Sequence, residues 1–388
     1  MVFQKLLKYK IYIGVEKWNC YILHGTSRSL VLRYDDANIS VEDGVIKQLK
    51  EIEELTLIGK QGVKNVLYVL NRDGFPKLKH FHVESNPELV YLVDFPKQSE
   101  PCVAFPHLQT LFLEDLSSLE KICHGQFSSN NFCQLRTIKV YSCVKLKNIF
   151  SSSIARHLSQ LEEIKVTGCE NMEEIFSIVG SENEEIVLEK LDSLSLWNLP
   201  KLRSFSYEGE VGSTYDQERQ KKDSLMPLFN GKVQFRNLKT LDPREINLKY
   251  VFSSSTLGSF VLLQSLDIHY CTVLEEIIRI DDLKNHFELP SLKELRISKC
   301  PAMKSLICSD KVTFPSLEEI EISDMDNLKM IWHNQFEDSQ NIRTCQKLCK
   351  VKVTNCQSLK NLFPASVVRN LWQLQRLNIE NCRVWKRS

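Results

Sequence analysis

A nine-residue pattern recurs along this chain of 388 residues and restricts its fold more than any other feature of the sequence. The pattern is L-x-x-L-x-L-x-x-C, in which other apolar residues replace some of the leucines. Successive copies start 25 to 31 residues apart, except for one interval of 47 residues. Repeats of this length indicate a solenoid rather than two or three globular domains. Six clear copies begin at Leu135, Leu161, Leu263, Leu292, Leu348 and Leu374, and weaker copies begin at Ile52, Leu78, Leu108, Leu191, Leu238 and Leu317.

Each copy predicts one short strand with a single buried face. The apolar residues of L-x-L alternate at period two, so they point to one side of the strand and the residues between them point to the other. One such strand cannot bury its apolar side alone, whereas stacked copies form a parallel sheet with a continuous core. The cysteine that ends the pattern is predicted to turn inward and pack beneath the next copy, since free cysteine is among the most buried residue types.

Short helical segments are expected on the return path of some repeats. Residues 152–161 combine a serine N-cap with helical apolar spacing, and residues 364–374 look alike. A longer block also recurs, since residues 146–164 are similar to residues 248–266 and 359–377. We therefore predict an α/β leucine-rich-repeat solenoid, or horseshoe, of about twelve repeats. Its concave face is expected to carry the parallel sheet, and its convex face irregular and short helical segments.

The repeat covers the whole chain, so we expect a single leucine-rich-repeat domain spanning residues 1–388. Residues 1–50 are expected to be an irregular N-terminal repeat region, and residues 206–233 an inserted polar loop. Pro243 occupies the place of a strand leucine and cannot donate to a ladder, so the sheet should be irregular there. The chain starts inside the pattern and ends directly after a strand, and we therefore expect it to be part of a longer protein.

Composition and cysteine content favour an intracellular protein without a membrane span. Lys and Arg number 50 against 49 Asp and Glu, and this balance gives no global attraction to nucleic acid or anionic membranes. No apolar stretch is long enough to span a bilayer. Six of the 13 cysteines share one place in the repeat, so we expect reduced, packed thiols and a cytosolic or nuclear compartment.

No constellation of residues predicts catalysis, a cofactor or a metal. The sequence contains no G-x-x-x-x-G-K-[ST], G-x-G-x-x-G, G-x-S-x-G or H-E-x-x-H motif. Cys345 and Cys349 are close in sequence, but no second ligand pair at zinc spacing lies nearby. His124 and His333 recur in equivalent segments without a visible partner nucleophile or carboxylate. We therefore expect a protein that is not an enzyme and that has neither a cofactor nor a metal site.

The residues between the strand leucines form the candidate binding surface. Three of them are large aromatic residues with no core to enter, and Trp and Tyr are enriched in binding hot spots. The charges change sign from one repeat to another, which suits a protein partner better than a polyanion. The candidate protein-binding residues are Phe112, Tyr141, Trp197, Lys139, Lys165, His269, Arg296, Glu319, Glu321, Lys350 and Lys352.

Three longer segments resemble the C-terminal repeats of plant disease-resistance proteins. They are DGFPKLKHFHVESNPELVYLV (73–93), FPHLQTLFLEDLSSLEKICHGQF (105–127) and LKNIFSSSIARHLSQLEEIKVTGCENMEEIF (146–176). The chain is similar over essentially its whole length to the coiled-coil, nucleotide-binding, leucine-rich-repeat (NLR) class of intracellular immune receptors. The resemblance implies recognition of pathogen effectors, or of host proteins that effectors modify, and autoinhibition of a nucleotide-binding switch. No motif of that switch occurs in these residues, so none of its nucleotide-binding residues can be assigned here.

Two other kinds of function are weighed beside this one. A free-standing leucine-rich-repeat adaptor would select substrates in the manner of F-box proteins or act as a truncated decoy, but residues 1–50 do not read as three amphipathic helices. An enzyme carried on a solenoid is disfavoured by the missing catalytic constellation. The expected partners are proteins, namely a pathogen effector, a guarded host protein or the receptor's own nucleotide-binding domain, and neither nucleic acid nor membrane.

Overall fold

Contacts between residues divide the chain into two compact units, residues 1–188 (unit 1) and residues 189–388 (unit 2). Each unit is described by itself. The computed structural model describes residues 8–13, 24–33, 51–59, 74–94, 103–125, 131–178, 185–207, 226–281, 286–307, 312–332, 345–363 and 365–383.

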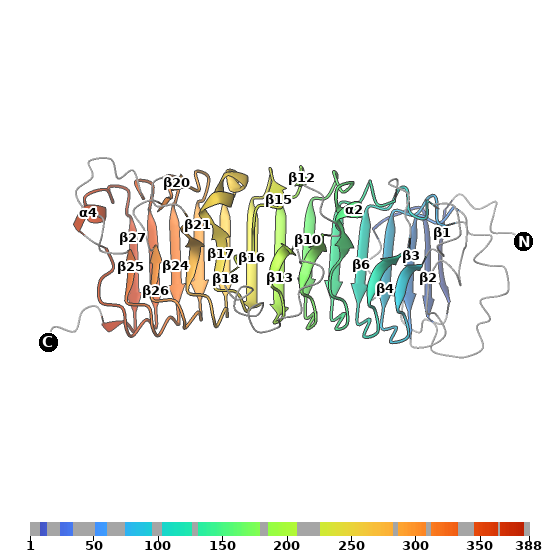
Figure 1. Ribbon diagram of the computed structural model, residues 1–388, viewed down its shortest axis with the longest axis horizontal. Helices are drawn as coiled ribbons and strands as arrows, with labels where there is room; N and C mark the ends of the chain where they lie inside the picture. Colours follow the sequence, from blue (N-terminus) through green and yellow to red (C-terminus); the bar gives the residue numbers. More distant parts are fainter. Residues whose placement is uncertain are drawn as a thin grey trace, which may run out of the picture. The chain divides into compact units, whose positions relative to one another are not determined.

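Unit 1 contains a series of short parallel strands, each paired with the next in the order of the chain (Figure 1). Every copy of the repeat predicted in this unit contains one of them. Two strands precede the first predicted copy. Tyr9–Ile13 pairs in parallel with Arg28–Arg33, which pairs in parallel with Glu54–Ile58, so the described part of residues 1–50 continues the sheet. The strands are β1 (Tyr9–Ile13), β2 (Arg28–Arg33), β3 (Glu54–Ile58), β4 (His80–Glu84), β6 (Thr110–Glu114), β8 (Thr137–Tyr141) and β10 (Glu163–Thr167).

Unit 2 repeats this arrangement, again with one main strand in each predicted copy. The predicted parallel-sheet leucine-rich-repeat solenoid is thus confirmed. The last main strand leaves Leu377 46% exposed, because no strand follows it among the described residues. The strands are β13 (Ser193–Leu199), β16 (Thr240–Ile246), β18 (Ser265–His269), β21 (Glu294–Ser298), β24 (Glu319–Ser323), β26 (Lys350–Thr354) and β27 (Arg376–Glu380).

The period-two pattern of the sequence separates the two sides of each main strand. In β8, Ile138 and Val140 are fully buried, whereas Thr137, Lys139 and Tyr141 are half-buried. The strands pair without offset, so Ile138 lies between Leu111 of β6 and Ile164 of β10. Burying an aliphatic side chain of this size contributes about 1.5–3 kcal/mol to stability, and the stacked rows therefore hold the repeats together.

Each clear copy of the repeat ends in the same turn. After β8, Ser142 adopts a positive φ of 52°, and its N–H donates to the carbonyl of Thr167 at 2.9 Å. The following Cys143 is buried, and its thiol donates to the Tyr141 carbonyl at 3.4 Å. The same thiol-to-carbonyl bond recurs at Cys169, Cys271, Cys300, Cys356 and Cys382. All of the described cysteines are free thiols, as the packing role of the repeat cysteine predicts.

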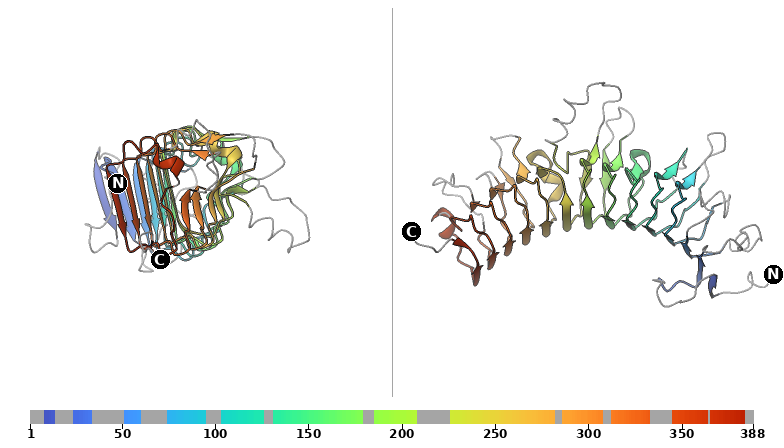
Figure 2. Two further views of the ribbon diagram at one scale, coloured as in Figure 1. Left: turned by 90° about the vertical axis from the view of Figure 1, so that its left-hand side faces the viewer. Right: turned by 90° about the horizontal axis from the view of Figure 1, so that it is seen from below.

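A second row of short strands faces the main strands across the core of each unit (Figure 2). In unit 1 this row contains β5 (Tyr91–Asp94), β7 (Lys121–His124), β9 (Phe150–Ser151), β11 (Glu174–Ser177) and β12 (Ile186–Leu188). In unit 2 it contains β14 (Ser204–Tyr207), β15 (Val233–Phe235), β17 (Tyr250–Ser253), β19 (Glu276–Arg279), β20 (Phe287–Glu288), β22 (Ser305–Ile307), β23 (Val312–Thr313) and β25 (Met330–Trp332).

The helices among the described residues are short and occur where the longer block of sequence recurs. They are α2 (Ser152–Ala155), the 3₁₀ helix η3 (Ser254–Phe260) and α4 (Ala365–Val368), one in each of the three similar blocks. The predicted helices at 152–161 and 364–374 are thus present but cover only four residues each. Among the described residues, no helix has the length and apolar character needed to cross a membrane.

The predicted polar loop at 206–233 has ordered margins. Ser206 is buried in β14, and Leu228 and Phe229 are buried at the other margin. Phe229 contacts Phe205, Phe235, Phe252 and Phe260 in an aromatic cluster of unit 2. These margins belong to the core because their apolar residues continue the repeat, and the remainder of the predicted loop, residues 208–225, lies outside the described residues.

Pro243 disturbs the sheet on one side only. It pairs with Leu196 of β13 within a continuous register. Towards β18, however, Thr240, Leu241 and Arg244 are paired while Asp242 and Pro243 are not. The missing N–H of proline explains this gap, and the Cys271 thiol donates to the Pro243 carbonyl at 3.9 Å.

Candidate functional site

The side of the main strands that faces away from the core, here called the strand face, carries all of the predicted binding residues. Each of them occupies a half-buried position that alternates with buried aliphatic residues. The structure divides them between the units. Unit 1 carries Phe112, Lys139, Tyr141 and Lys165, and unit 2 carries Trp197, His269, Arg296, Glu319, Glu321, Lys350 and Lys352.

A groove of about 630 Å³ lies on the strand face of unit 1. Phe112 of β6 and both Lys139 and Tyr141 of β8 line it, so the structure brings three predicted residues together. Lys165 lies one strand further along, with its Nζ 5.7 Å from the centre of the Tyr141 ring. The rest of the polar lining is His24, Glu54, Thr56, His80, His82, Glu84, Thr110, Glu114, Thr137 and Glu163.

The aromatic residues of the groove pack on one another. The Phe112 ring stacks on the His82 imidazole with centroids 4.3 Å apart and an interplanar angle of 7°. Its other neighbour, Tyr141, meets it edge-on at 5.0 Å. The contacts follow from the register, because His82 pairs with Phe112 and the next strand places Tyr141 beside Glu114. The result is a rigid aromatic wall that is half-buried within the sheet.

Histidines and a buried carboxylate also line the groove, beside the aromatic residues. The His24 ring stacks on His80 at 4.0 Å. Glu54 of β3 is buried, and its carboxylate accepts hydrogen bonds from the hydroxyls of Thr26 and Ser29, both at 2.9 Å. Burial, and then the neighbouring His24, lowers the pKa of both His80 and His82 to about 4. These imidazoles are therefore neutral at physiological pH.

The other carboxylates of the groove have different surroundings. Glu163 lies 3.3 Å from the Lys139 ammonium and forms an ion pair with it. Glu84 and Glu114 form no ion pair with Lys or Arg in the described part of the chain. Burial, followed by repulsion from neighbouring carboxylates, raises the pKa of both. The groove thus combines aromatic surface with two carboxylates, those of Glu84 and Glu114, that form no ion pair with Lys or Arg among the described residues.

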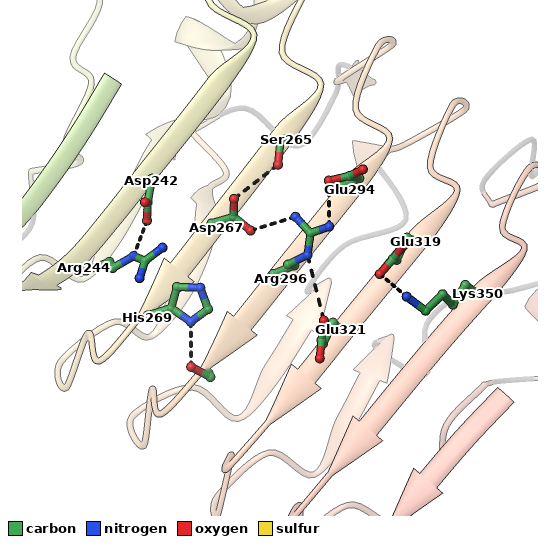
Figure 3. Close-up of polar contacts among 11 residues, drawn as sticks. Asp242, Arg244, Ser265, Asp267, His269, Glu294, Arg296, Glu319, Glu321 and Lys350 are labelled. Carbon is green, nitrogen blue, oxygen red and sulfur yellow. Dashed lines mark hydrogen bonds and ion pairs between the residues drawn. The ribbon is translucent and has the colours of Figure 1, made fainter. Parts of the chain in front are cut away.

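A network of ion pairs crosses the strand face of unit 2 (Figure 3). Arg296 of β21 lies at its centre, with guanidinium nitrogens 2.8 Å from Glu294, 3.3 Å from Asp267 and 3.9 Å from Glu321. Asp267 and Glu321 pair with Arg296 in the register of the adjacent strands, so the contacts follow directly from the unshifted stacking of repeats.

The charged residues predicted on β24 and β26 contact one another. The Lys350 ammonium lies 2.7 Å from Glu319, and the Lys352 ammonium lies 2.5 Å from Glu321. The hydrogen bond from Lys352 lowers the pKa of Glu321. The charges whose sign alternates along the sequence therefore form ion pairs with one another within the sheet.

A second group of contacts on the strand face of unit 2 includes the aromatic residue Trp197 of β13. The Arg244 guanidinium lies 4.5 Å from the centre of the Trp197 ring and donates from Nε to Asp242 at 2.6 Å. His269, which pairs with Arg244 in the sheet, hydrogen-bonds to the Ser298 hydroxyl at 2.6 Å. Its pKa is lowered by burial and then by Arg244.

Several residues of these clusters are missing from the predicted set. Glu84 occupies the fifth position of β4, and extending the period-two pattern by one step would have found it. Asp242 and Arg244 flank Pro243, which interrupts the pattern that marks the strand face. His24 carries no repeat signal, and only the fold places it beside His80.

Comparisons with known proteins agree with the repeat. The sequence matches the profile of the family described as plant disease resistance protein RPS2-like, leucine-rich repeats, at residues 46–170, 107–214 and 213–383. No curated protein matches the chain.

Two solved structures are similar to the chain at low TM-scores. The crystal structure of the TLR13–ssRNA13 complex has a TM-score of 0.40 and 17% identity, over 92% of this chain and 51% of that chain. The chain therefore spans about half the length of that protein. A leucine-rich-repeat protein of Leptospira interrogans has a TM-score of 0.29 and 17% identity, over 90% of this chain and 94% of that chain.

Proposed function

Because the chain belongs to the RPS2-like leucine-rich-repeat family of plant disease resistance proteins, we propose that it is the protein-recognition module of an intracellular immune receptor. In this role it senses a pathogen effector, or a host protein that an effector modifies, in the cytoplasm or nucleus. It also helps to hold the nucleotide-binding switch of the receptor inactive. Leucine-rich-repeat solenoids are typically interaction scaffolds, and the extended strand face offers such a scaffold here.

The groove of unit 1 is the observation that carries the proposal. Phe112 and Tyr141 are held in fixed orientations by their ring contacts, so binding a partner costs little side-chain entropy. Rigid aromatic side chains at the centre of a concave patch are typical anchors of a protein interface. Glu84 and Glu114 beside them favour a partner segment that carries a basic side chain.

The network of unit 2 is less suited to be the main anchor. Its charged groups contact one another at 2.5 to 3.9 Å, so a partner would have to replace ion pairs that already exist. Such replacement gives little net affinity, although complementary charge still sets specificity and association rate. We therefore assign it a supporting role in selecting the partner.

Photo-cross-linking from the groove tests this proposal. A benzophenone side chain at position 137, where Thr137 lines the groove, is compared with one at position 159, where exposed Ser159 lies on the return path. Both full-length chains are irradiated in extracts of healthy and pathogen-challenged plant tissue. The proposal predicts a discrete protein adduct from position 137 that position 159 does not give. The same adducts from both positions, or none from position 137, would contradict it.

The size of the native protein separates a receptor from a free-standing adaptor. An immunoblot against these repeats should show a band far above the 45.1 kDa of the chain if the repeats belong to a receptor. A band near 45.1 kDa would instead support the adaptor or decoy. Tyr9–Ile13 and Arg28–Arg33 are strands, so these residues do not belong to the amphipathic helices of an F-box.

A further inference from the structure

We infer that His82, Glu84 and Glu114 in the groove of unit 1 form a binding site for a divalent transition-metal cation, with an imidazole nitrogen and two carboxylates as ligands. No pattern in the sequence predicted this site. His82 and Glu84 belong to one strand and Glu114 to the next, so only the pairing of β4 with β6 brings them together.

The register of the two strands fixes the arrangement. Residues 82 and 84 are two apart on β4 and therefore project on the same side of the sheet. Glu114 is the direct partner of Glu84 on β6, and Phe112 is the direct partner of His82. The Phe112 ring stacks on the His82 imidazole with centroids 4.3 Å apart, and this contact holds the imidazole beside the two carboxylates.

The distances suit a shared ion. His82 Nε2 lies 3.9 Å from Glu84 Oε2 and 3.8 Å from Glu114 Oε2. Metal–ligand bonds to histidine nitrogen and carboxylate oxygen are about 2.0–2.2 Å long, so two of them together reach about 4.2 Å. One ion can therefore contact the nitrogen and either oxygen without moving them. The three ligand atoms lie within 4.8 Å of one another, and rotation of a carboxylate closes the remaining gap.

The imidazole nitrogen needs a partner that the described residues do not supply. His82 Nε2 is buried and makes no hydrogen bond in the described part of the protein. A buried polar atom left unsatisfied costs about 1–3 kcal/mol. At 3.9 and 3.8 Å, the carboxylate oxygens of Glu84 and Glu114 lie beyond hydrogen-bond distance of this nitrogen. An imidazole nitrogen is the commonest metal ligand in proteins.

The charge around the nitrogen favours a cation. Asp115 adds a third carboxylate that repels both Glu84 and Glu114. Arg33 attracts Glu84. Other acidic residues of the strand face contact a lysine or an arginine, as Glu163 contacts Lys139 and Glu294 contacts Arg296. A bound dication would relieve this repulsion and satisfy the imidazole at the same time.

The chemistry of the ligands selects the class of metal. Imidazole with carboxylates suits zinc and its first-row neighbours, whereas calcium and magnesium prefer oxygen ligands alone. Three protein ligands leave a coordination position open towards the groove, because all three residues line it. In the metal-bound form, a donor atom of a protein partner would occupy that position, whereas a basic side chain of the partner would contact the same carboxylates in the metal-free form. Metal binding itself requires no partner, so it is tested independently of the proposed function.

Cobalt(II) and zinc titrations of the full, reduced chain test the site. Cobalt reports ligand type, since a site without sulfur gives weak d–d bands and no sulfur-to-metal charge-transfer band. This distinction matters because the chain contains 13 cysteines. We expect a single cobalt site of the nitrogen and oxygen type that zinc displaces.

Substitutions of the ligands provide the decisive comparison. Glu84→Gln and Glu114→Gln keep side-chain shape, and each should weaken zinc binding by about tenfold or more. Glu163→Gln, in the same groove but paired with Lys139, is the matched control and should leave affinity unchanged. Circular dichroism confirms that each variant is folded. No cobalt binding by the wild type, a cysteine-type spectrum, or equal affinity in all variants would overturn the assignment.

Discussion

Burial at the level of single residues follows the alternation of the repeat. Ile138 is fully buried between Leu111 and Ile164, whereas its neighbour Thr137 is half-buried on the strand face. Ile138→Ala should lower the free energy of unfolding by about 2–5 kcal/mol, because it removes buried methyl groups and leaves a cavity. Thr137→Ala is the control and should change it by about 0.5 kcal/mol or less. Denaturant titrations measure both, and equal losses would contradict the assignment of the two sides.

The environment of His269 predicts a dependence of stability on pH. Burial and then Arg244 lower its pKa in the folded chain, with Arg296 acting in the same direction and Asp242 and Asp267 in the opposite one. As pH falls through about 6.5, the unfolded chain takes up a proton that the folded chain resists, so stability falls. His269→Gln should remove this contribution to the dependence of the unfolding free energy on pH. Unfolding free energies between pH 7 and pH 5 measure it, and parallel curves for the two proteins would contradict the prediction.

At the scale of elements, a polar side chain links neighbouring repeats inside unit 1. Asn131 is buried, and its carbonyl oxygen accepts hydrogen bonds from the backbone N–H groups of Ala104 at 2.7 Å and Phe105 at 3.2 Å. Asn131→Ala should destabilise the unit by about 2–4 kcal/mol, because each buried N–H left unpaired costs about 1–3 kcal/mol.

Asn171 offers the matched comparison for that substitution. It also links two repeats, by donating to the Val144 carbonyl at 2.7 Å, but it lies in a half-buried position where water can replace the bond. Asn171→Ala should therefore cost about 1 kcal/mol. Thermal unfolding of both variants makes the comparison, and an equal shift in Tm would show that burial of Asn131 is not what matters.

The repeat predicts the main strands well because its period-two pattern is local. It finds a strand in every predicted copy but overlooks β1 and β2, whose sequences YKIYI and RSLVLR lack the flanking leucine and cysteine. The short return strands are also missed, since their two to four residues are specified by stacking against the next repeat. The helical spacing at 152–161 predicts too long a helix, because the helix ends after Ala155.

The strand face could be predicted as a surface but not as two different sites. The sequence shows that Glu319 and Glu321 lie one repeat before Lys350 and Lys352, yet their pairing depends on an unshifted register. The groove depends on contacts such as that of His24 with His80, which no repeat encodes. The cluster of His82, Glu84 and Glu114 likewise requires β4 and β6 to be placed side by side.

For the molecule as a whole, the two units offer surfaces of different chemical character. The strand face of unit 1 presents a groove with an aromatic wall and the carboxylates of Glu84 and Glu114, which form no ion pair with Lys or Arg among the described residues. That of unit 2 presents charges that neutralise one another, as around Arg296. A net charge of +1 gives no global electrostatic steering, so recognition has to come from such local surfaces.

The most direct test of this account is the affinity of a cross-linked partner for groove variants of the full chain. Phe112→Ala and Tyr141→Ala should each leave the fold intact by circular dichroism and weaken binding by about 2 kcal/mol, or about 30-fold in Kd. Trp197→Ala should have a smaller effect, and Ser159→Ala on the return path should have none. Unchanged affinity in both groove variants, measured by calorimetry beside the wild type, would contradict the assignment of the groove as the recognition site.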